Sequence, residues 1–560
     1  MKLRSLLVPL LILALPASAR SQAEPTPGAV TLIDELRLTL REAVELGLEN
    51  NLDLEIERTG PELARARVRQ AQGAFDPIGF AEYGHDHLEL PIANPVQNVF
   101  SGGQVEDQIV NDTWSAGAGF QGKLPFGLSY SSTYGFDKTK TSSSFVALEP
   151  EYAPTWMTEI TLPLLRDFFY NEPSVNVKRN RISEQISIED FRSRLMDLVV
   201  SIEQAYWGLA AARAEHGVSE KSMQTAIDLL ELTRVQYEVG VVSRVNVTQA
   251  EAGVAEREFN EIGAENRAEN AADVLLDLIT RPDLAAYRHT LIETENPTFV
   301  EYEISEEQSV ARAMQFRPEL EAERHRVEES DLSLTLARNQ RLPRLDLTAS
   351  YALRGLSGSQ KRPADQANPP FSNCSFDKDG APIPLGAPCV STATPDSPDL
   401  GFPSPAGGAH DDFFTAAGSH SWGVMGRVEI PIGNRSARAV EIQRRIEARR
   451  ARTRLSRLKQ TVVLQVREAV RNLLSATRGI RSAERRRVAQ QETLRAEEER
   501  LRLGDSTPYD VLQFERDLAD AERQEIFALR AYRNNIAALE RAQGTSLRAL
   551  GIAIEQELAP

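Results

Sequence analysis

The chain has 560 residues, enough for several ordinary domains, and a formal net charge of -17 at pH 7. An acidic chain binds nucleic acid poorly, so that class of function is disfavoured. Only two cysteines are present, and no run of apolar residues after the N-terminus has the length of a transmembrane helix.

The N-terminus has the pattern of an exported protein. Lys2 and Arg4 precede the short apolar run LLVPLLILALP, and an A-x-A cleavage site ends at Ala19. The run is too short to span a bilayer, so we predict a secretory signal peptide at residues 1–19. If the mature chain spans a membrane, it must do so as β-strands.

The mature chain contains two diverged copies of one unit. NLDLEIER from residue 51 aligns with RPELEAER from residue 317, and QYEVGVVSRVNV from residue 236 aligns with RLRLGDSTPYDV from residue 500. The predicted parts are an N-terminal segment at 20–36, repeat 1 at 37–283, a linker at 284–302, repeat 2 at 303–555 and a tail at 556–560.

Each copy is predicted to begin with a capped helix and to continue with strands. Thr39 with Glu42, and Ser305 with Gln308, have the spacing of a capping box. Apolar and polar residues alternate, as in strands with one dry and one wet face, at about 77–87, 112–122, 128–137, 153–163, 344–354 and 420–431. Two alternatives stay open: six strands if the hairpin 112–137 joins the sheet, and four if it does not.

A long helical hairpin follows the strands in each copy. Residues 174–281 and 432–507 contain no proline, and their apolar residues recur at steps of three and four, as in a coiled-coil seam. A single helix over 432–503 would run roughly 100 Å at about 1.5 Å per residue. Gly240 and Gly504 are predicted to mark the turns of the two hairpins.

Residues 356–417 form a long, polar loop rich in proline, which is either a functional surface segment or partly disordered. Both cysteines lie in it. Cys374 and Cys389 form either a local disulfide, which an oxidising compartment favours, or two free thiols. A zinc site would need further ligands at suitable spacing, so no metal site is predicted.

Several motifs favour ordinary structural explanations over chemistry. GAGFQG has the glycine spacing of a dinucleotide fingerprint, but a turn follows it instead of a helix. His85 and His87 share one strand face and would need a third ligand to hold a metal, so a polar strand end is favoured, as it is for His410. The basic run from residue 444 favours a solvated helix face with ion pairs.

Catalytic signatures are absent from the sequence. Tyr206 and Trp207 at helical spacing are predicted to be packing residues rather than a ligand cage. The sequence contains no phosphate-binding G-x-x-x-x-G-K-[ST] loop, no G-x-S-x-G nucleophile elbow and no H-E-x-x-H zinc motif. We therefore predict a protein that is not an enzyme and carries no cofactor.

The strands predict an oligomer. Lipid forbids open sheet edges, so membrane strands must close into a barrel. Four or six strands are too few, because about eight strands is the smallest working barrel. Several copies of the chain must therefore close one barrel together, with the long helices extending it outside the bilayer.

These residues resemble the TolC-type outer-membrane efflux protein family. The resemblance rests on LTLREAVELGLENN near the start, RPEL and LPRLDL in repeat 2, and the paired turns YEVGVVSRVNV and LRLGDSTPYDVL. It implies an α+β membrane protein, with a trimeric outer-membrane β-barrel continuous with a periplasmic α-helical coiled-coil barrel. It also implies a passive exit duct that works with a periplasmic adaptor and an inner-membrane pump of the RND, ABC or MFS type.

The resemblance also implies functional positions in this chain. The adaptor is expected to contact the hairpin turns, which are Val239, Gly240, Val241, Leu503, Gly504 and Asp505. The constriction of the periplasmic mouth is expected at Asp510 and Gln513, and at the matching Asn246 and Gln249 of repeat 1. Only one of these four residues is acidic, which weakens the expectation of a strongly cation-selective gate.

Two other classes of protein compete with this interpretation. The first is a periplasmic adaptor, but such a protein has one helical hairpin, whereas this chain has two hairpins and paired alternating strands. The second is a secreted structural coiled coil, which leaves the strands bearing Trp and Tyr unexplained. The sequence does not indicate which substrate is exported.

Overall fold

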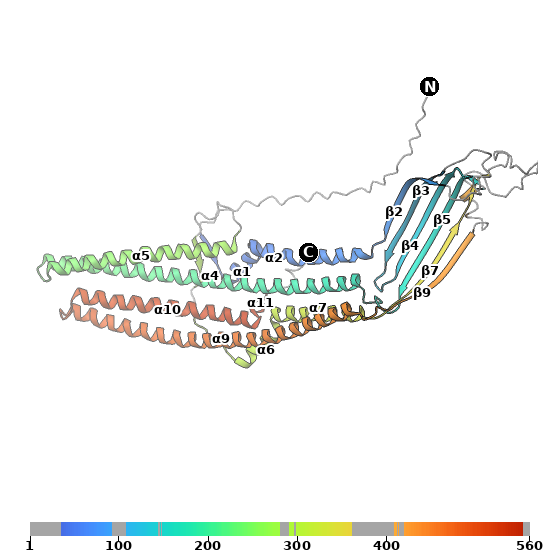
Figure 1. Ribbon diagram of the computed structural model, residues 1–560. Helices are drawn as coiled ribbons and strands as arrows, with labels where there is room; N and C mark the ends of the chain where they lie inside the picture. Colours follow the sequence, from blue (N-terminus) through green and yellow to red (C-terminus); the bar gives the residue numbers. More distant parts are fainter. Residues whose placement is uncertain are drawn as a thin grey trace, which may run out of the picture. The chain divides into compact units, whose positions relative to one another are not determined.

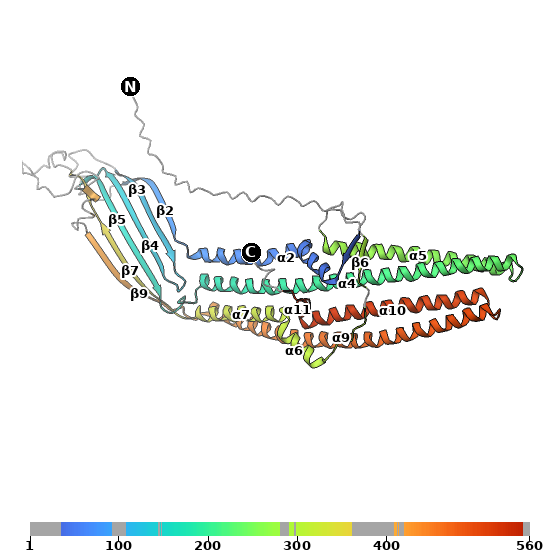
Figure 2. The ribbon, with the colours of Figure 1, turned by 180° about the vertical axis from the view of Figure 1, so that it is seen from behind.

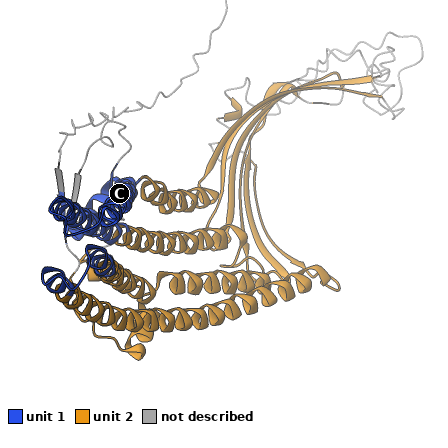
Figure 3. Cartoon of the chain, turned by 90° about the vertical axis from the view of Figure 1, so that its left-hand side faces the viewer, with its two compact units in different colours: residues 1–51, 205–297, 497–519 blue, residues 52–204, 298–496, 520–560 orange. Residues whose placement is uncertain are grey.

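The computed structural model describes residues 35–91, 108–143, 146, 148–280, 291–295, 298–360, 408–410, 413 and 419–552. The predicted signal peptide, Cys374, Cys389 and the tail 556–560 lie outside these residues. Two compact units divide the chain (Figure 3). Unit 1 comprises residues 1–51, 205–297 and 497–519, and unit 2 comprises residues 52–204, 298–496 and 520–560.

The helices of the two copies correspond in order and in length (Figure 1). Repeat 1 has α1 Leu40–Asn50, α2 Leu52–Gln72, α4 Glu172–Glu238 and α5 Arg244–Ile279, and repeat 2 has α6 Glu306–Phe316, α7 Pro318–Asn339, α9 Arg435–Arg502 and α10 Pro508–Gln543. Helices α4 and α9 have 67 and 68 residues, and α5 and α10 have 36 each. Equivalent helices of the two predicted copies thus have nearly the same lengths.

The first helix of each copy begins where the sequence predicts it. The Thr39 backbone amide donates to Glu42 Oε2 (2.9 Å) and the Glu42 amide donates to Thr39 Oγ1 (3.3 Å), which completes a capping box. In repeat 2 the Ser305 hydroxyl accepts from the Gln308 amide at 3.4 Å. Both caps satisfy amides that the first helical turn leaves without partners.

The long strands form one antiparallel sheet in unit 2, in the order β2-β3-β4-β5-β7-β9, with β8 paired to β5 (Figures 1 and 2). Their bounds are β2 Ile78–Pro91, β3 Gln108–Lys123, β4 Ser129–Thr141, β5 Leu148–Pro163, β7 Arg344–Arg354, β8 Ser357–Gln360 and β9 Ser419–Glu429. The hairpin 112–137 thus belongs to the sheet, which settles the alternative of four or six long strands in favour of six.

The seam predicted along α9 forms a hydrophobic core within unit 2. Val462, Val466 and Leu473 are fully buried and pack with Tyr532 and Leu539 of α10. Burying each aliphatic side chain contributes about 2 kcal/mol. Steps of three and four along α9 keep these residues on one face, so the seam holds the two helices of the hairpin together.

A buried tyrosine ties separate segments together in each unit. In unit 1, Tyr206 Oη donates to the Leu38 carbonyl (2.9 Å) and accepts from the Glu295 amide (2.9 Å), which joins the ends of β1 Glu35–Leu38 and β6 Leu291–Thr294. In unit 2, Tyr532 Oη donates to the Val300 carbonyl at 2.6 Å. Tyr206 and Trp207 are therefore packing residues, as predicted.

Within the described part of the chain, no helix combines the length and the apolar character that crossing a bilayer requires.

Candidate functional site: the hairpin turns and the faces of the sheet

The two hairpin turns have the same backbone geometry. Gly240 and Gly504 both have φ +78°, a left-handed conformation that glycine adopts without strain. The Val241 amide donates to the Gln236 carbonyl, and the Asp505 amide donates to the Arg500 carbonyl, both at 2.9 Å. These bonds close the C-termini of α4 and α9. The structure therefore places a turn at each glycine that the sequence predicts.

The side chains of the two turns differ in chemistry. Val239 and Val241 are 69% and 72% exposed, so the first turn presents apolar side chains to solvent. The second turn exposes Leu503 (82%) beside charged groups, with Arg500 Nε 3.5 Å from Asp505 Oδ2. Exposed apolar residues at the end of a hairpin are typical of a contact surface for another protein.

The four predicted constriction residues lie in the first two turns of α5 and α10. Asp510 is half-buried, and its carboxylate accepts from the Thr507 hydroxyl (2.6 Å) and the Thr507 amide (3.2 Å). Asn246 occupies the matching position and accepts from the Ser243 hydroxyl at 2.6 Å. Gln249 and Gln513 are exposed one turn further along. Asp510 and Asn246 therefore stabilise the N-terminal turns of their helices.

An arginine behind these turns connects the two hairpins inside unit 1. Arg257 of α5 is buried, and its guanidinium donates to the Leu512 carbonyl of α10 (2.8 Å) and to the Gly253 carbonyl (3.1 Å). Leu512 Cδ1 would lie 3.1 Å from a Cβ at Gly253, so glycine allows this close approach. The start of α10, which carries Asp510, is thus held against α5.

A buried carboxyl group lies beside this connection. Burial raises the pKa of Glu515 on α10 to about 7, although the Arg257 guanidinium opposes the shift. Glu498 of α9 raises this pKa further, and Thr225 and Lys221 of α4 lower it. Glu515 therefore changes its charge near neutral pH, within two turns of the predicted constriction.

Sequence reasoning missed Arg257 and Glu515. The repeat alignment places Glu515 opposite Glu251, but Glu251 is exposed and contacts Arg234 at 2.9 Å. The same residue type thus has opposite environments in the two copies. The sequence offered one signal, Gly253, because a glycine within a helix can mark close packing against another helix. It does not indicate which helix packs there.

The sheet has two chemically distinct faces, which the strand register defines. The apolar face carries Tyr83, Trp114, Phe120, Tyr134, Phe136, Trp156, Ile160, Leu347, Tyr351, Trp422, Val424 and Val428. The polar face carries Glu82, Asp86, Thr113, Ser115, Gln121, Ser131, Thr133, Asp137, Glu159, Thr161, Asp346, Thr348, Ser350 and Arg427. Apolar exceptions on the polar face include Ile109, Met157, Met425 and four residues of β2.

Large apolar side chains on the apolar face are exposed, with Trp422 at 75% and Val424 at 63%. Two hydroxyls on this face have partners within it: the Trp156 indole donates to Ser132 Oγ at 2.9 Å, and Ser132 Oγ lies 3.0 Å from Thr158 Oγ1. An exposed face of this composition suits hydrocarbon, where a polar group without a partner is costly.

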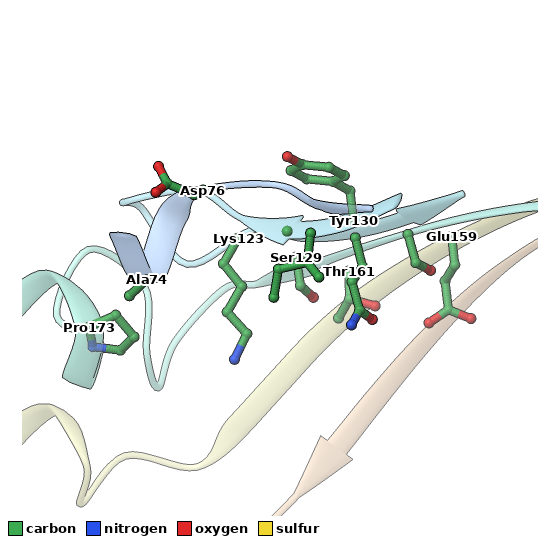
Figure 4. A pocket seen from close by; sticks show the side chains of 12 residues that line it. Ala74, Asp76, Lys123, Ser129, Tyr130, Glu159, Thr161 and Pro173 are labelled. Carbon is green, nitrogen blue, oxygen red and sulfur yellow. The ribbon is translucent and has the colours of Figure 1, made fainter. Parts of the chain in front are cut away.

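The polar face is hollowed where the sheet meets the helices. A hollow of about 470 Å³ is lined by residues that include Lys123, Ser131, Glu159 and Thr161. Figure 4 shows Lys123, Thr161 and Glu159 on one side of the sheet and Tyr130 on the other. This surface is suited to water and polar solutes.

The glycine-rich segment and the basic run occupy ordinary structural positions. The glycines of GAGFQG lie in β3, where a Cβ at Gly119 would come within 2.6 Å of the Ser132 carbonyl oxygen. Among the described residues, no group of three or more His, Cys, Asp and Glu is arranged to hold a metal. In the basic run, Arg452 pairs with Asp331 of α7 at 2.8 Å.

The comparisons with known proteins agree with this geometry. Residues 125–280 and 310–545 match the outer membrane efflux protein family. The chain belongs to this family. None of the curated proteins matches the chain.

Solved structures of outer-membrane channels share the fold. The CmeC channel of Campylobacter jejuni has 15% identity and a TM-score of 0.59, over 93% of this chain and 89% of that one. VceC of Vibrio cholerae has 14% identity and a TM-score of 0.58, over 90% and 96%. The open state of MtrE from Neisseria gonorrhoeae has 17% identity and a TM-score of 0.57, over 91% and 89%.

Family and fold together identify an outer-membrane efflux duct. The predicted α+β fold class and the outer-membrane location are thereby confirmed. Both the family and the structural relatives are channels.

Proposed function

We propose that three copies of this chain form one passive duct, which an inner-membrane pump serves through a periplasmic adaptor. The observation that carries the proposal is a sheet of six long strands with one apolar face, one polar face and two outer strands that lack a second neighbour. Those strands are β2 and β9 in the described sheet. Each has a row of backbone amides and carbonyls available for pairing.

Pairing between copies satisfies these edges. In lipid each unpaired backbone group costs several kcal/mol, so β2 of one copy must pair with β9 of the next. A closed ring of copies leaves no edge, and cyclic symmetry makes every junction the same. Three copies with six strands each make an eighteen-stranded barrel.

The strand number bears on what the duct can pass. Barrels of 16–18 strands leave an aqueous channel, whereas eight-stranded barrels fill with side chains. The repeat alignment matches β2 with β7 and β5 with β9 in sequence. The hairpin β3–β4 therefore occurs in repeat 1 and has no counterpart in repeat 2. This hairpin widens the barrel from twelve strands to eighteen, with the polar face lining the lumen.

The hairpin turns are proposed as the adaptor contact. The apolar turn at Val239 and Val241 and the more charged turn at Leu503 and Asp505 give the adaptor two different surfaces. Adaptor tips would therefore bind at two sites on each copy. Apolar contacts at such a surface supply affinity, and charged groups supply orientation.

Asp510 is proposed as the charged position of the periplasmic mouth. Three copies bring three Asp510 carboxylates into one ring, which attracts cations. Asn246 and Gln249 add no charge. The proposed duct catalyses no reaction, so the pump supplies the energy and selects the cargo.

The test is conductance together with assembly. Purified protein in planar bilayers should form ion-conducting pores, and unheated samples should migrate as a trimer that heating converts to single chains. A variant that lacks residues 112–137 should still assemble into a trimer. Its pores should have a lower conductance, because the barrel has fewer strands and is narrower. A protein that stays monomeric and does not conduct would refute the proposal.

A further inference from the structure

A cationic and aromatic cluster lies on the apolar face of the sheet, at the end of the strands remote from the helices. It is defined by Trp114 of β3, Lys138 and Lys140 of β4, His85 of β2 and Tyr152 of β5. Lys138 Nζ lies 5.3 Å from the Trp114 ring centroid and 5.9 Å from that of Tyr152, and Lys140 Nζ lies 5.7 Å from Trp114. His85 stacks on Trp114 at 4.7 Å.

Both lysines lack an ion-pair partner among the residues that the structure describes. The acid across from Lys140 in the strand register is Asp112, and its Oδ1 lies 2.7 Å from His87 Nδ1. The other ring nitrogen of His87 lies 3.2 Å from Glu89. Two neighbouring carboxylates are thus engaged by a histidine, and the two ammonium groups keep their capacity to bind an anion.

Charged groups of both signs lie on the apolar face at this end of the sheet, where Asp112 and Glu89 share it with Lys138 and Lys140. Lys138 and Lys140 of β4 lie on the apolar face. Asp137 of β4 and Glu151 of β5 lie on the polar face. The alternation of sign along β4 therefore follows the alternation of faces. Lys138 and Lys140 have no ion-pair partner in the described part of the chain, and on a face turned to hydrocarbon they call for a specific partner, because desolvating a charge is costly.

The position of the cluster along the strands matches a membrane interface, given the proposed barrel. Tyr130 pairs with Gly122 near the helical end of the sheet, and Lys138 pairs with Trp114 eight residues further along β4. Eight residues span about 26 Å of strand at about 3.3 Å each, which is a rise of about 20 Å when the strand tilts by about 40°, and Lys140 lies about 5 Å higher. Outer-membrane barrels carry an apolar band about 25 Å tall between two aromatic girdles. The cluster thus lies at the outer girdle, facing the outer leaflet.

We propose that this cluster binds the phosphate group of an anionic, phosphorylated lipid of the outer leaflet. The inference rests on the proposed function, because the apolar face must face lipid. Two lysines on one indole give a phosphate two charged donors at a fixed spacing, and the rings beneath them contact the upper acyl chains. The lysine stems follow the apolar surface while their ammonium groups reach the headgroup layer.

The experiment measures lipid binding to the intact, delipidated trimer by native mass spectrometry. The probes are diphosphoryl lipid A and its dephosphorylated form. The test variant is Lys138→Gln/Lys140→Gln. The control is Lys123→Gln/Lys178→Gln, which removes the same charge from the polar face and from helix α4. Lys138→Arg/Lys140→Arg keeps both charges.

We expect the trimer to bind the phosphorylated lipid and the test variant to bind it roughly 30-fold more weakly, since each lysine near an anionic lipid surface contributes about a factor of five. The control and the arginine variant should bind as the wild type does. Equal binding by the test variant and the control, or equal binding of the dephosphorylated lipid, would overturn the lipid site alone. A spectrum with single chains and no trimer would overturn the proposed function as well.

Discussion

Replacing Glu515 with glutamine should make the protein more stable at alkaline pH and leave it nearly unchanged at acid pH. Glu515 is 8% exposed, and in the described part of the chain its Oε2 has no hydrogen-bond partner. Glutamine keeps the size and shape of the neutral side chain but cannot ionise. The difference between variant and wild type therefore isolates the cost of the buried charge.

The size of the effect follows from the pKa. Burial raises the pKa of Glu515 from 4.5 to about 7, so the folded state holds its proton over a range in which the unfolded state has lost it. The stabilisation from this group is full below about pH 4.5 and is lost as the pH rises through about 7. A shift of one pKa unit corresponds to about 1.4 kcal/mol of unfolding free energy. The unfolding free energy of the wild type is therefore lower by about 1 kcal/mol at about pH 5 and by roughly 3 kcal/mol at about pH 8 than at low pH, where Glu515 is protonated in both states.

The assay is thermal unfolding of the detergent-solubilised trimer at about pH 5 and about pH 8. Glu515→Gln should gain roughly 2 kcal/mol more at the higher pH than at the lower pH. Glu251→Gln is the matched control, because Glu251 occupies the equivalent position of repeat 1 on the surface. A gain that does not change with pH, or the same gain in the control, would refute the reasoning.

Three further predictions concern other residues of unit 1. Arg257→Gln should destabilise the trimer by about 2–4 kcal/mol, because the Leu512 carbonyl loses its donor and Glu515 loses its counter-charge. Thermal unfolding measures this loss, and an unchanged melting temperature would contradict the prediction. Asp510→Asn should lower the cation preference measured as a reversal potential across a salt gradient, and an unchanged potential would exclude Asp510 from that role. Gly240→Ala should strain the turn by about 1 kcal/mol and weaken adaptor binding in a titration, whereas wild-type affinity would argue against contact at this turn.

The strands and turns could be predicted because their signals are local. Alternation in segments such as 344–354 reflects one polar and one apolar face, and a two-residue period is readable in a single segment. Gly240 and Gly504 interrupt long helical patterns at equivalent places, and both have the left-handed φ that explains a glycine there. The duplication supports each of these predictions with a second, independent copy.

The site could be predicted only in part, because its contacts join distant residues. The bond from Arg257 to the Leu512 carbonyl links residues 255 apart, and a backbone acceptor leaves no trace in residue type. Glu251 and Glu515 are the same residue in the repeat alignment, yet only Glu515 is buried. Burial there depends on which helices pack together, and periodicity alone does not determine it.

The cluster around Trp114 illustrates the same limit on the sheet. The sequence placed Trp114 on an apolar strand face and identified His85 and His87 as a polar strand end. Lys138 and Lys140 fall opposite Trp114 and Asp112 only once the register between β3 and β4 is known. A shift of one residue would move both lysines to the polar face.

Cross-linking between β2 and β9 tests the central claim most directly. Cysteines would be placed singly along both strands of a chain that lacks Cys374 and Cys389, and oxidised in the outer membrane. The account predicts that pairs with one cysteine on each strand give cross-linked species up to three chains, in a register that repeats every two residues. If no pair between β2 and β9 joins separate chains, the edges are not sealed by neighbouring copies and the shared duct is contradicted.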